Sequence, residues 1–189
     1  MADKPHYGMV KDTRHCVGCQ TCTVSCKISN DVPEEAYWNH MESLTGDTLY
    51  QSVGTYPKCD LSFRPMLCNH CENPACVKHC PTGAMHKDES TGLVLVDQSI
   101  CIGCGYCSWV CPYNAPSMDT VNRVMSKCTF CKDRIAKDQE PFCVQSCIAN
   151  ARIFGDLNDP ESEVSQLIAK HHGQQYLSEC GTNPSVYYI

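Results

Sequence analysis

Cysteine is the residue type in this sequence with the clearest chemistry. Of the 189 residues, 18 are cysteine, about one in ten, which is the level at which a cysteine-based scaffold is suspected. Sixteen of the 18 fall into four groups of four, and each group begins as C-x2-C and ends as C-x3-C. Thiols in such groups hold zinc, form disulfides or hold iron–sulfur clusters, and the spacing distinguishes these possibilities.

The first and third groups follow the bacterial ferredoxin run C-x2-C-x2-C-x3-C, and Pro112 follows the third. Such a run wraps three corners of an iron–sulfur cube, whereas zinc sites are built from C-x2-C pairs. In the fourth group eleven residues separate two pairs, and there zinc fits as well as iron. Disulfides fit worst, because cysteines at i and i+3 on a tight loop seldom bridge well. The absence of C-x-x-C-H excludes a c-type haem.

A distant cysteine must complete each cube, and in two-cluster ferredoxins the last cysteine of one run ligates the other run's cluster. Groups two and three are neighbours in sequence, which leaves groups one and four to pair with each other. The rule predicts four [4Fe–4S] clusters held by all sixteen grouped cysteines. The ligand sets, each named by its first member, are Cys16, Cys19, Cys22 and Cys147; Cys128, Cys131, Cys143 and Cys26; Cys68, Cys71, Cys76 and Cys111; and Cys101, Cys104, Cys107 and Cys80.

Clusters with four cysteine ligands leave no iron open to a substrate, so they suit electron transfer. No nucleophile–base pair, phosphate loop or dinucleotide motif is evident elsewhere, so a non-catalytic role with no catalytic residues is predicted. With 15 basic and 21 acidic side chains the net charge is −6, which gives no electrostatic reason to bind nucleic acid.

The elements that position the cysteines are predicted to be short, in an α+β fold of two bacterial-ferredoxin-like modules in one compact chain. Residues 6–11 are predicted to form a strand and residues 84–97 a β-hairpin. Residues 124–128 and 151–155 are candidates for a similar pairing. Short helices are predicted over residues 21–29, 105–110 and 129–136.

The segment 31–65 is interpreted as an irregular insertion because it contains Pro, Gly and Asn. A helix capped by Asp159 is predicted to run to about residue 171, and the tail from residue 173 to be extended. In three groups an alanine follows the last cysteine by four residues, where a small side chain suits close approach to a cluster. These are Ala84, Ala115 and Ala151.

The residues beside the cysteines have less specific roles. Four lysines could raise the reduction potentials of nearby clusters or be solvated surface residues. Three histidines are neighbours of the cysteines, where such residues are more often loop residues than ligands. The residues are Lys27, Lys78, Lys127 and Lys132, and His15, His70 and His79. The two ungrouped cysteines, Cys59 and Cys180, are expected to be buried thiols.

The N-terminus has no apolar leader segment and no twin arginine, and the longest aliphatic run, residues 93–96, is far too short to span a membrane. A soluble chain without its own address is therefore expected. Cytoplasmic residence and export as a passenger of a partner both stay open.

Several motifs together resemble the four-cluster iron–sulfur subunit of the dimethyl sulfoxide reductase family, over about residues 5–157. They are Cys68-Asn-His-Cys71-Glu-Asn-Pro-Ala-Cys76, Cys80-Pro-Thr-Gly-Ala-Met-His-Lys87, Cys101-Ile-Gly-Cys104, Cys111-Pro-Tyr-Asn-Ala-Pro116, Lys127-Cys-Thr-Phe-Cys131-Lys-Asp-Arg134 and Cys143-Val-Gln-Ser-Cys147. Nitrate reductase relatives carry Trp at the position of Cys107, so the cysteine here implies a fourth cubane.

The resemblance implies a catalytic partner subunit with a molybdenum or tungsten pterin cofactor, and a quinol-oxidising membrane anchor as a further partner. The chain would then be peripheral to the cytoplasmic membrane and relay electrons to the catalytic subunit. The expected division is an inner module over 55–119, an outer module over 1–35 plus 120–157, and a C-terminal helix and tail over 158–189. Three alternatives stay open: a polyferredoxin or subunit of a formate dehydrogenase, hydrogenase or polysulfide or tetrathionate reductase system; a free-standing polyferredoxin; and a zinc-stabilised interaction module.

Overall fold

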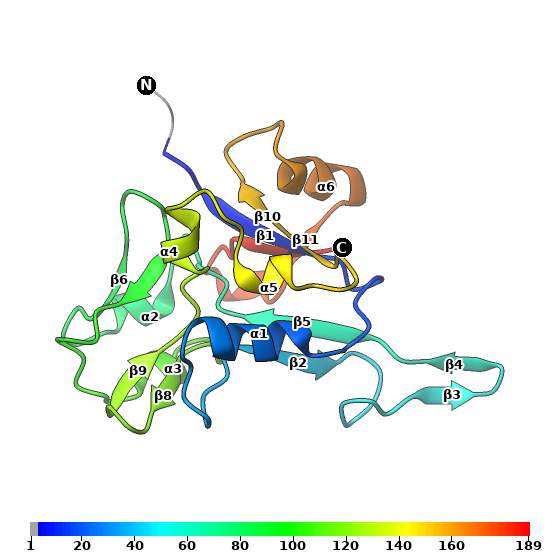
Figure 1. Ribbon diagram of the computed structural model, residues 1–189, viewed down its shortest axis with the longest axis horizontal. Coiled ribbons are helices and arrows are strands. Elements are labelled where there is room, and N and C mark those ends of the chain that lie inside the picture. Colours follow the sequence, from blue (N-terminus) through cyan, green and yellow to red (C-terminus); the bar gives the residue numbers. More distant parts are fainter. Residues whose placement is uncertain (1–3) are drawn as a thin grey trace.

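A mixed four-stranded sheet lies at the centre of the molecule, of which the computed structural model describes residues 4–189 (Figure 1). In spatial order its strands are β10 (Arg152–Asp156), β1 (Tyr7–Lys11), β12 (Val186–Tyr188) and β11 (Gln174–Gln175). Strand β1 pairs antiparallel with β10 and parallel with β12, so segments near both ends of the chain share one sheet. The strand predicted over residues 6–11 is confirmed. Met9 and Val10 are fully buried on opposite faces of this strand: Met9 packs in the main hydrophobic cluster, and helix α6 (Glu163–His171) packs on β1 and β10.

Two β-hairpins and two short helices form one end of the molecule, at the left in Figure 1. The hairpins are β6 (Met85–Lys87) with β7 (Val94–Val96), as predicted, and β8 (Ser117–Asp119) with β9 (Val124–Ser126). Helices α2 (Ala75–Lys78) and α3 (Tyr106–Trp109) pack against each other. Local chemistry makes the first turn, because the Asp88 carboxylate accepts hydrogen bonds from Ser90 and Thr91 before Gly92 turns the chain at φ +71°.

A second pair of helices lies in the middle of the molecule. Helix α1 (Thr21–Ser29) packs against α5 (Phe142–Gln145), and the Ser146 hydroxyl donates a 2.8 Å hydrogen bond to Ser25 Oγ. Helix α4 (Lys132–Ile135) precedes α5. The helix predicted over 21–29 is confirmed as α1, whereas those predicted over 105–110 and 129–136 are present as the shorter α3 and α4.

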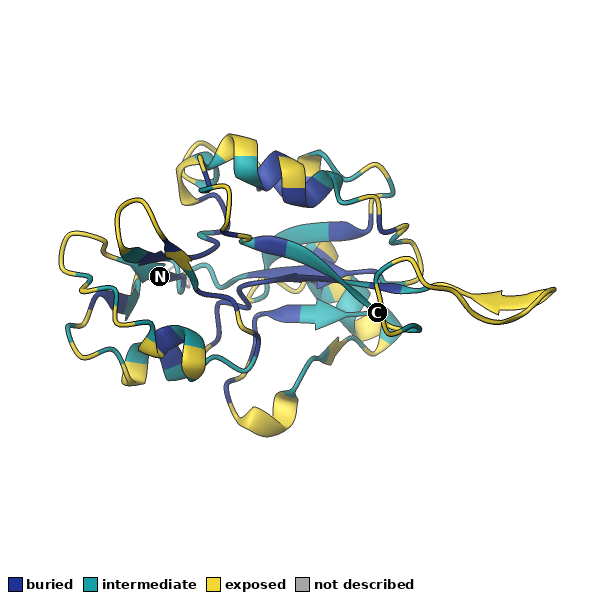
Figure 2. Ribbon diagram, turned by 90° about the horizontal axis from the view of Figure 1, so that it is seen from below, coloured by how far each residue is buried: buried dark blue, intermediate teal, exposed yellow. Residues whose placement is uncertain are grey.

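The segment 31–65 is more regular than predicted. Strand β2 (Asn39–Ser43) pairs antiparallel with β5 (Phe63–Leu67), and Phe63, Met66 and Leu67 of β5 are buried. Between them β3 (Val53–Thr55) and β4 (Lys58–Asp60) form a hairpin, called the arm here, in which every residue is exposed. Figure 2 shows the arm projecting away from the body of the molecule. The interpretation as irregular was wrong because the Pro- and Gly-containing sequence gives no local sign that β2 and β5 pair.

Two other local predictions are wrong. Residues 124–128 do not pair with 151–155, since β9 pairs with β8 and β10 pairs with β1. The cap of α6 is Ser162, whose Oγ accepts the amide hydrogen of Ser165 at 3.4 Å, while Asp159 accepts that of Glu161 in a preceding turn.

The tail beyond residue 173, predicted as extended, contains β11, the 3-10 helix η1 (Ser178–Cys180) and β12. The α+β fold class is confirmed.

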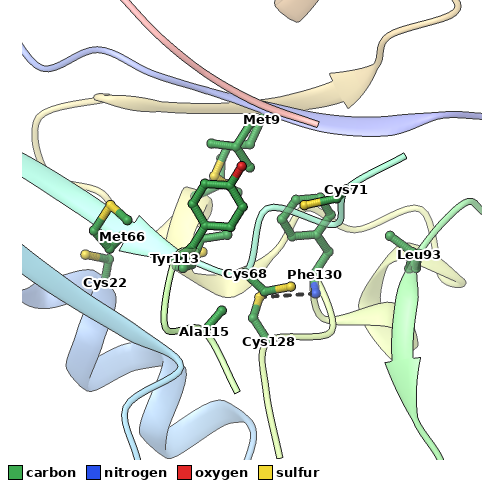
Figure 3. Packing of buried hydrophobic residues seen from close by; sticks show 14 residues of the cluster. Met9, Cys22, Met66, Cys68, Cys71, Leu93, Tyr113, Ala115, Cys128 and Phe130 are labelled. Atoms are coloured by element: carbon green, nitrogen blue, oxygen red, sulfur yellow. Dashed lines mark hydrogen bonds between the residues drawn. The ribbon is translucent and has the colours of Figure 1, made fainter. Parts of the chain in front are cut away.

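The largest buried cluster joins segments from the whole chain, and cysteines form much of it (Figure 3). The aromatic side chains of Tyr113 and Phe130 and the sulfur of Met9 fill the space between thiol-bearing loops. The cysteines in this cluster are Cys22, Cys68, Cys71, Cys128 and Cys143.

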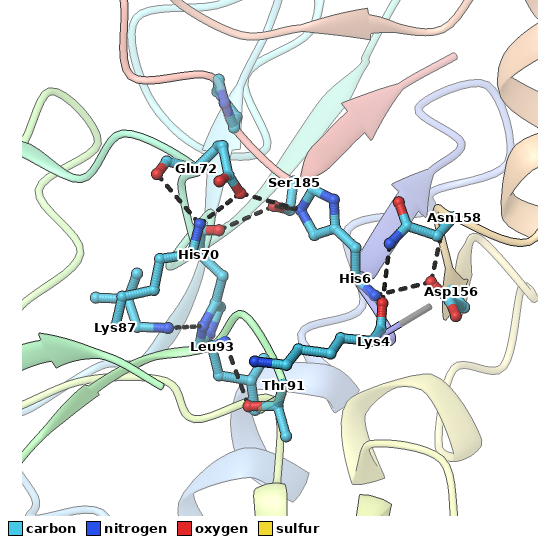
Figure 4. A network of polar contacts seen from close by, with 12 residues as sticks. Lys4, His6, His70, Glu72, Lys87, Thr91, Leu93, Asp156, Asn158 and Ser185 are labelled. Carbon is cyan, nitrogen blue, oxygen red and sulfur yellow. Dashed lines mark hydrogen bonds and ion pairs between the residues drawn. The ribbon is translucent and has the colours of Figure 1, made fainter. Parts of the chain in front are cut away.

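Polar contacts tie the two ends of the chain to the loop of the second cysteine group (Figure 4). The Ser185 hydroxyl donates to the carbonyl oxygen of His70 at 2.9 Å and lies 2.9 Å from His6 Nε2. Glu72 forms an ion pair with Lys87 of β6. The second group is therefore held against β1, β6 and the residue before β12.

Candidate metal centre

The loop between the first two cysteines has the same backbone turn in all four groups. The residue before the second cysteine is left-handed in each, with φ of +66° at Gly18, +42° at His70, +64° at Gly103 and +51° at Phe130. A second left-handed position precedes each of the three buried alanines expected from the sequence, with φ of +72° at Gly83, +48° at Asn114 and +47° at Asn150. The four groups are thus structural repeats as well as sequence repeats.

The four cysteines of the Cys101 set line one small cavity. Cys80 reaches it from the second group, and the other three come from the third. Backbone amides face two of the sulfurs, because Met85 N–H donates to Cys80 Sγ and Met125 N–H to Cys101 Sγ, both at 3.4 Å. Among the described residues, no charged side chain lines this cavity.

The Cys16 set lines a cavity of nearly the same size. Here Cys147 comes from the fourth group, and its sulfur accepts a 3.3 Å hydrogen bond from the amide of Ala151. The walls are again mainly apolar, with Arg152 as the one charged side chain among the described lining residues. Each cavity therefore combines three cysteines of one group with the last cysteine of another.

The cysteines of the Cys68 set are also near one another. Burial raises the pKa of Cys71 to about 12, with Cys68 and Cys111 adding to the rise. Burial likewise raises the pKa of Cys76 to about 12, again with contributions from Cys68 and Cys111, while the nearby Lys127 opposes it. Cys111 of the third group thus lies with three cysteines of the second.

The Cys128 set shows the same arrangement. Burial raises the pKa of Cys26 to about 12, and the charges of Cys143 and Cys131 add to the rise. The Asn30 side-chain amide lies 3.7 Å from both Cys26 Sγ and Cys131 Sγ, and Phe130 N–H donates to Cys128 Sγ at 3.4 Å. Cys26 of the first group therefore lies with cysteines of the fourth.

Neighbouring sets are linked in a row. Burial raises the pKa of Cys143, and Cys22 of the Cys16 set adds to it. The charge of Cys68 likewise acts on Cys128. Cys76 and Cys107 share a second hydrophobic cluster. The row runs from the Cys16 set through the Cys128 and Cys68 sets to the Cys101 set.

The donor set fits a polynuclear cluster better than single ions. No three Cys, His, Asp or Glu side chains between residues 4 and 189 stand close enough to hold one metal ion. Sulfurs spaced around an apolar cavity, with amides directed at them, match the surroundings of a cysteine-ligated cluster. Burial raises the pKa of Cys26, Cys71 and Cys76, which makes their thiols harder to ionise, and a metal bound by these thiolates displaces their protons.

The residues around the cysteines divide by burial. Of the four lysines beside the cysteines, Lys127 alone is buried, and its ammonium donates to the carbonyl oxygens of Val94 and Cys128. His70 is buried too, and its Nδ1 accepts the amide hydrogen of Val94 at 3.1 Å. His15 and His79 are exposed. The expectation for Cys59 and Cys180 is wrong, since both thiols are exposed.

Two buried basic side chains near the thiols were missed from the sequence. Lys11 is fully buried at the end of β1, where it donates to Pro65 O at 2.7 Å and lies 3.3 Å from Tyr188 Oη. Arg152 is 4% exposed at the start of β10. Arg152 directly follows the repeated Ala151, which is the one sequence signal for it. Lys11 has no such signal, because one basic residue at a strand end is usually solvated.

No described helix combines the length and apolar character that crossing a bilayer requires.

Comparison with known proteins places this geometry in a family. A family model described as a 4Fe-4S dicluster domain matches residues 59–157. One subunit of the sulfite dehydrogenase of Allochromatium vinosum is 41% identical over 96% of the present sequence and 81% of the relative. One subunit of the tetrathionate reductase of Salmonella typhimurium is 39% identical over 97% and 72%, respectively. One chain of the anaerobic dimethyl sulfoxide reductase of Escherichia coli is 38% identical over 86% and 80%.

These similarities extend over nearly the whole chain, including the first cysteine group that lies outside the family model. They agree with four repeated cysteine loops, two of whose predicted ligand sets surround apolar cavities. The bound cofactors are therefore [4Fe–4S] clusters, and the role is electron transfer rather than catalysis. The protein belongs to the family of iron–sulfur electron-transfer subunits of dimethyl sulfoxide reductase-type molybdopterin oxidoreductases.

Proposed function

We propose that the Cys16, Cys128, Cys68 and Cys101 sets each hold one [4Fe–4S] cluster and form a four-step electron relay. The carrying observation is that two separate cavities are each lined by three cysteines of one group and the last cysteine of another. A cube has four corners, and an interleaved set supplies a thiolate to each of them. When bound, the clusters supply one-electron redox chemistry. The proposed modules are residues 55–119 and residues 1–35 with 120–157.

The protein's own residues exclude water, hold the thiolates and position the two ends of the relay. Apolar walls surround the terminal cavities, and backbone amides donate to Cys80, Cys101 and Cys147. Hydrogen bonds of this kind stabilise the more negative, reduced state. Cys19 and Cys104, the second cysteines of the two terminal sets, are exposed. This exposure brings both ends of the row close to the surface, where electrons can enter and leave.

The proposed partners are a catalytic subunit with a molybdenum or tungsten pterin cofactor and, at the other end, a quinol-linked membrane subunit or another donor. The complex would be a dimethyl sulfoxide reductase-like enzyme that is peripheral to the cytoplasmic membrane. The support is that the relatives are named as single subunits or chains of sulfite, tetrathionate and dimethyl sulfoxide enzymes. A stable complex with a large pterin-containing chain is expected on co-purification, and a lone brown protein would instead favour a free polyferredoxin.

Anaerobic metal analysis tests the relay directly. Four cubanes require about sixteen irons and sixteen sulfides per chain. Cys147→Ser should alter one cluster's spin signal after dithionite reduction, and Cys104→Ser should alter a different one. Cys180→Ser is the matched control, because this exposed cysteine lies outside all four sets. A zinc-containing protein with no iron, or identical effects of the first two variants on the same signal, would contradict the proposal.

A further inference from the structure

Arg152 is a buried guanidinium with unfinished hydrogen bonding. The side chain is 4% exposed and lines the cavity of the Cys16 set. Its Nη1 donates to Asn39 Oδ1 at 2.8 Å, whereas Nη2 is buried without any hydrogen-bond partner. A buried hydrogen-bond donor without an acceptor destabilises the fold. The group that binds in this cavity is therefore expected to complete the surroundings of Nη2.

The charge of Arg152 also lacks a counter-charge. Among the described residues, no carboxylate forms an ion pair with it. The groups of opposite charge that act on Arg152 are cysteine thiolates and the Tyr188 phenolate, when they are ionised. Burial alone would lower the pKa of Arg152, but the charges of Cys22, Cys143 and Cys147 outweigh burial and raise it. An unpaired buried cation is strongly destabilising, so a negative group beside it is expected in the loaded protein.

The Cys101 set provides an internal comparison. Its cavity has nearly the same volume and a similarly apolar wall, but no charged lining residue among those described. Both cavities receive backbone amides on their sulfurs. Among the described lining residues, Arg152 is therefore the one charged side chain that distinguishes the two cavities.

We propose that Arg152 is a positioning residue whose buried positive charge raises the reduction potential of the cluster held by the Cys16 set. The inference rests on the proposed function. Reduction adds one electron from the neighbouring redox group, with no bond formed or broken, and the added negative charge is stabilised by the guanidinium. A buried opposite charge within a few ångströms shifts protonation equilibria by roughly 1–3 pKa units. An effect of the same size on electron uptake changes the equilibrium constant for reduction tenfold or more. Each tenfold change corresponds to 59 mV in the potential of a one-electron couple.

The test is an electron paramagnetic resonance redox titration of the complete complex carrying Arg152→Gln. The signal of the Cys16 set is identified as the one that Cys147→Ser alters. Its potential should fall by an amount equivalent to about a tenfold loss in the reduction equilibrium. Arg152→Lys keeps the charge and should retain most of the wild-type potential. The signal altered by Cys104→Ser should stay at its wild-type potential in both variants. Lys58→Gln, which removes an exposed basic side chain of the arm, is the matched control and should shift neither.

Asn39→Asp provides a second route if Arg152→Gln does not load with iron. This nearly isosteric change places a carboxylate against Nη1 and neutralises Arg152 in place. It should also lower the potential of the Cys16 set. Unchanged potentials in Asn39→Asp with full iron content, or an equal fall in Arg152→Lys and Arg152→Gln, would overturn the inference. Loss of all clusters from the wild-type complex would instead overturn the proposed function, so the two failures are distinguishable.

Discussion

Left-handed backbone at single residues shapes each cysteine loop, and the surroundings decide which of those positions need glycine. Gly103, before Cys104, has φ of +64°, and an added Cβ would lie 2.2 Å from the carbonyl oxygen of Arg123. Gly83 has φ of +72° with no atom within 4 Å of the added Cβ. His70 and Phe130 lie before the second cysteine of their own loops, as Gly103 does, and they carry full side chains. Sequence spacing predicted these loops, but it could not reveal that His70 and Phe130 would adopt left-handed backbone there.

A pair of glycine substitutions separates strain from collision. Gly83→Ala should cost about 1–2 kcal/mol in unfolding free energy, because an L residue is forced into left-handed backbone. Gly103→Ala should cost roughly 1–3 kcal/mol more, because its methyl group meets main-chain oxygen that cannot move aside. Chemical denaturation of the iron-loaded protein measures both, with iron content as the check on loading. Equal losses of stability in the two variants would show that the contact with Arg123 is not a barrier.

Elements near in sequence were predictable, and those built by distant segments were not. The hairpin β6–β7 follows from its own turn residues, and α1 from the segment after Cys19. Strand β12 lies parallel to β1 although the two are separated by almost the whole chain, so no local pattern indicates the pairing. The β2–β5 pair was missed for the same reason. Strand pairs between distant segments depend on tertiary contacts rather than on the β-propensity of either strand.

The arm and the last strand are predicted to differ sharply in their contribution to stability. Replacing residues 53–60 by Gly-Gly should shift the thermal midpoint by only a few degrees, because every strand residue of the arm is exposed. Val53 and Asp60 are cross-strand partners, so a short link can join their neighbours. Truncation after Thr182 removes β12 with the fully buried Val186 and should prevent stable folding and iron loading. Iron content and circular dichroism measure both, and a stable truncated chain would contradict the account.

At the scale of the molecule, the cysteines both bind the cofactors and form the core. Cys22, Cys68 and Cys128 belong to the same buried cluster as Met9 and Phe130. The sequence predicted which cysteines come together in the two terminal cavities, because the ferredoxin rule fixes partners by order along the chain. It did not predict the buried basic side chains, because burial of a lone charge depends on the assembled fold. The spacing of the cysteines therefore determines which of them come together, and the fold determines which charged side chains lie beside them.

The central claim is that the four clusters are held by interleaved cysteines in one row. Anomalous diffraction from iron-loaded crystals, collected on both sides of the iron absorption edge, tests it most directly. The account predicts four compact four-iron peaks in the order of the Cys16, Cys128, Cys68 and Cys101 sets. Sulfur of Cys147 should lie on the first peak and sulfur of Cys80 on the last. Peaks ligated by four cysteines of a single group, or isolated single-metal peaks at the cysteine pairs, would contradict it.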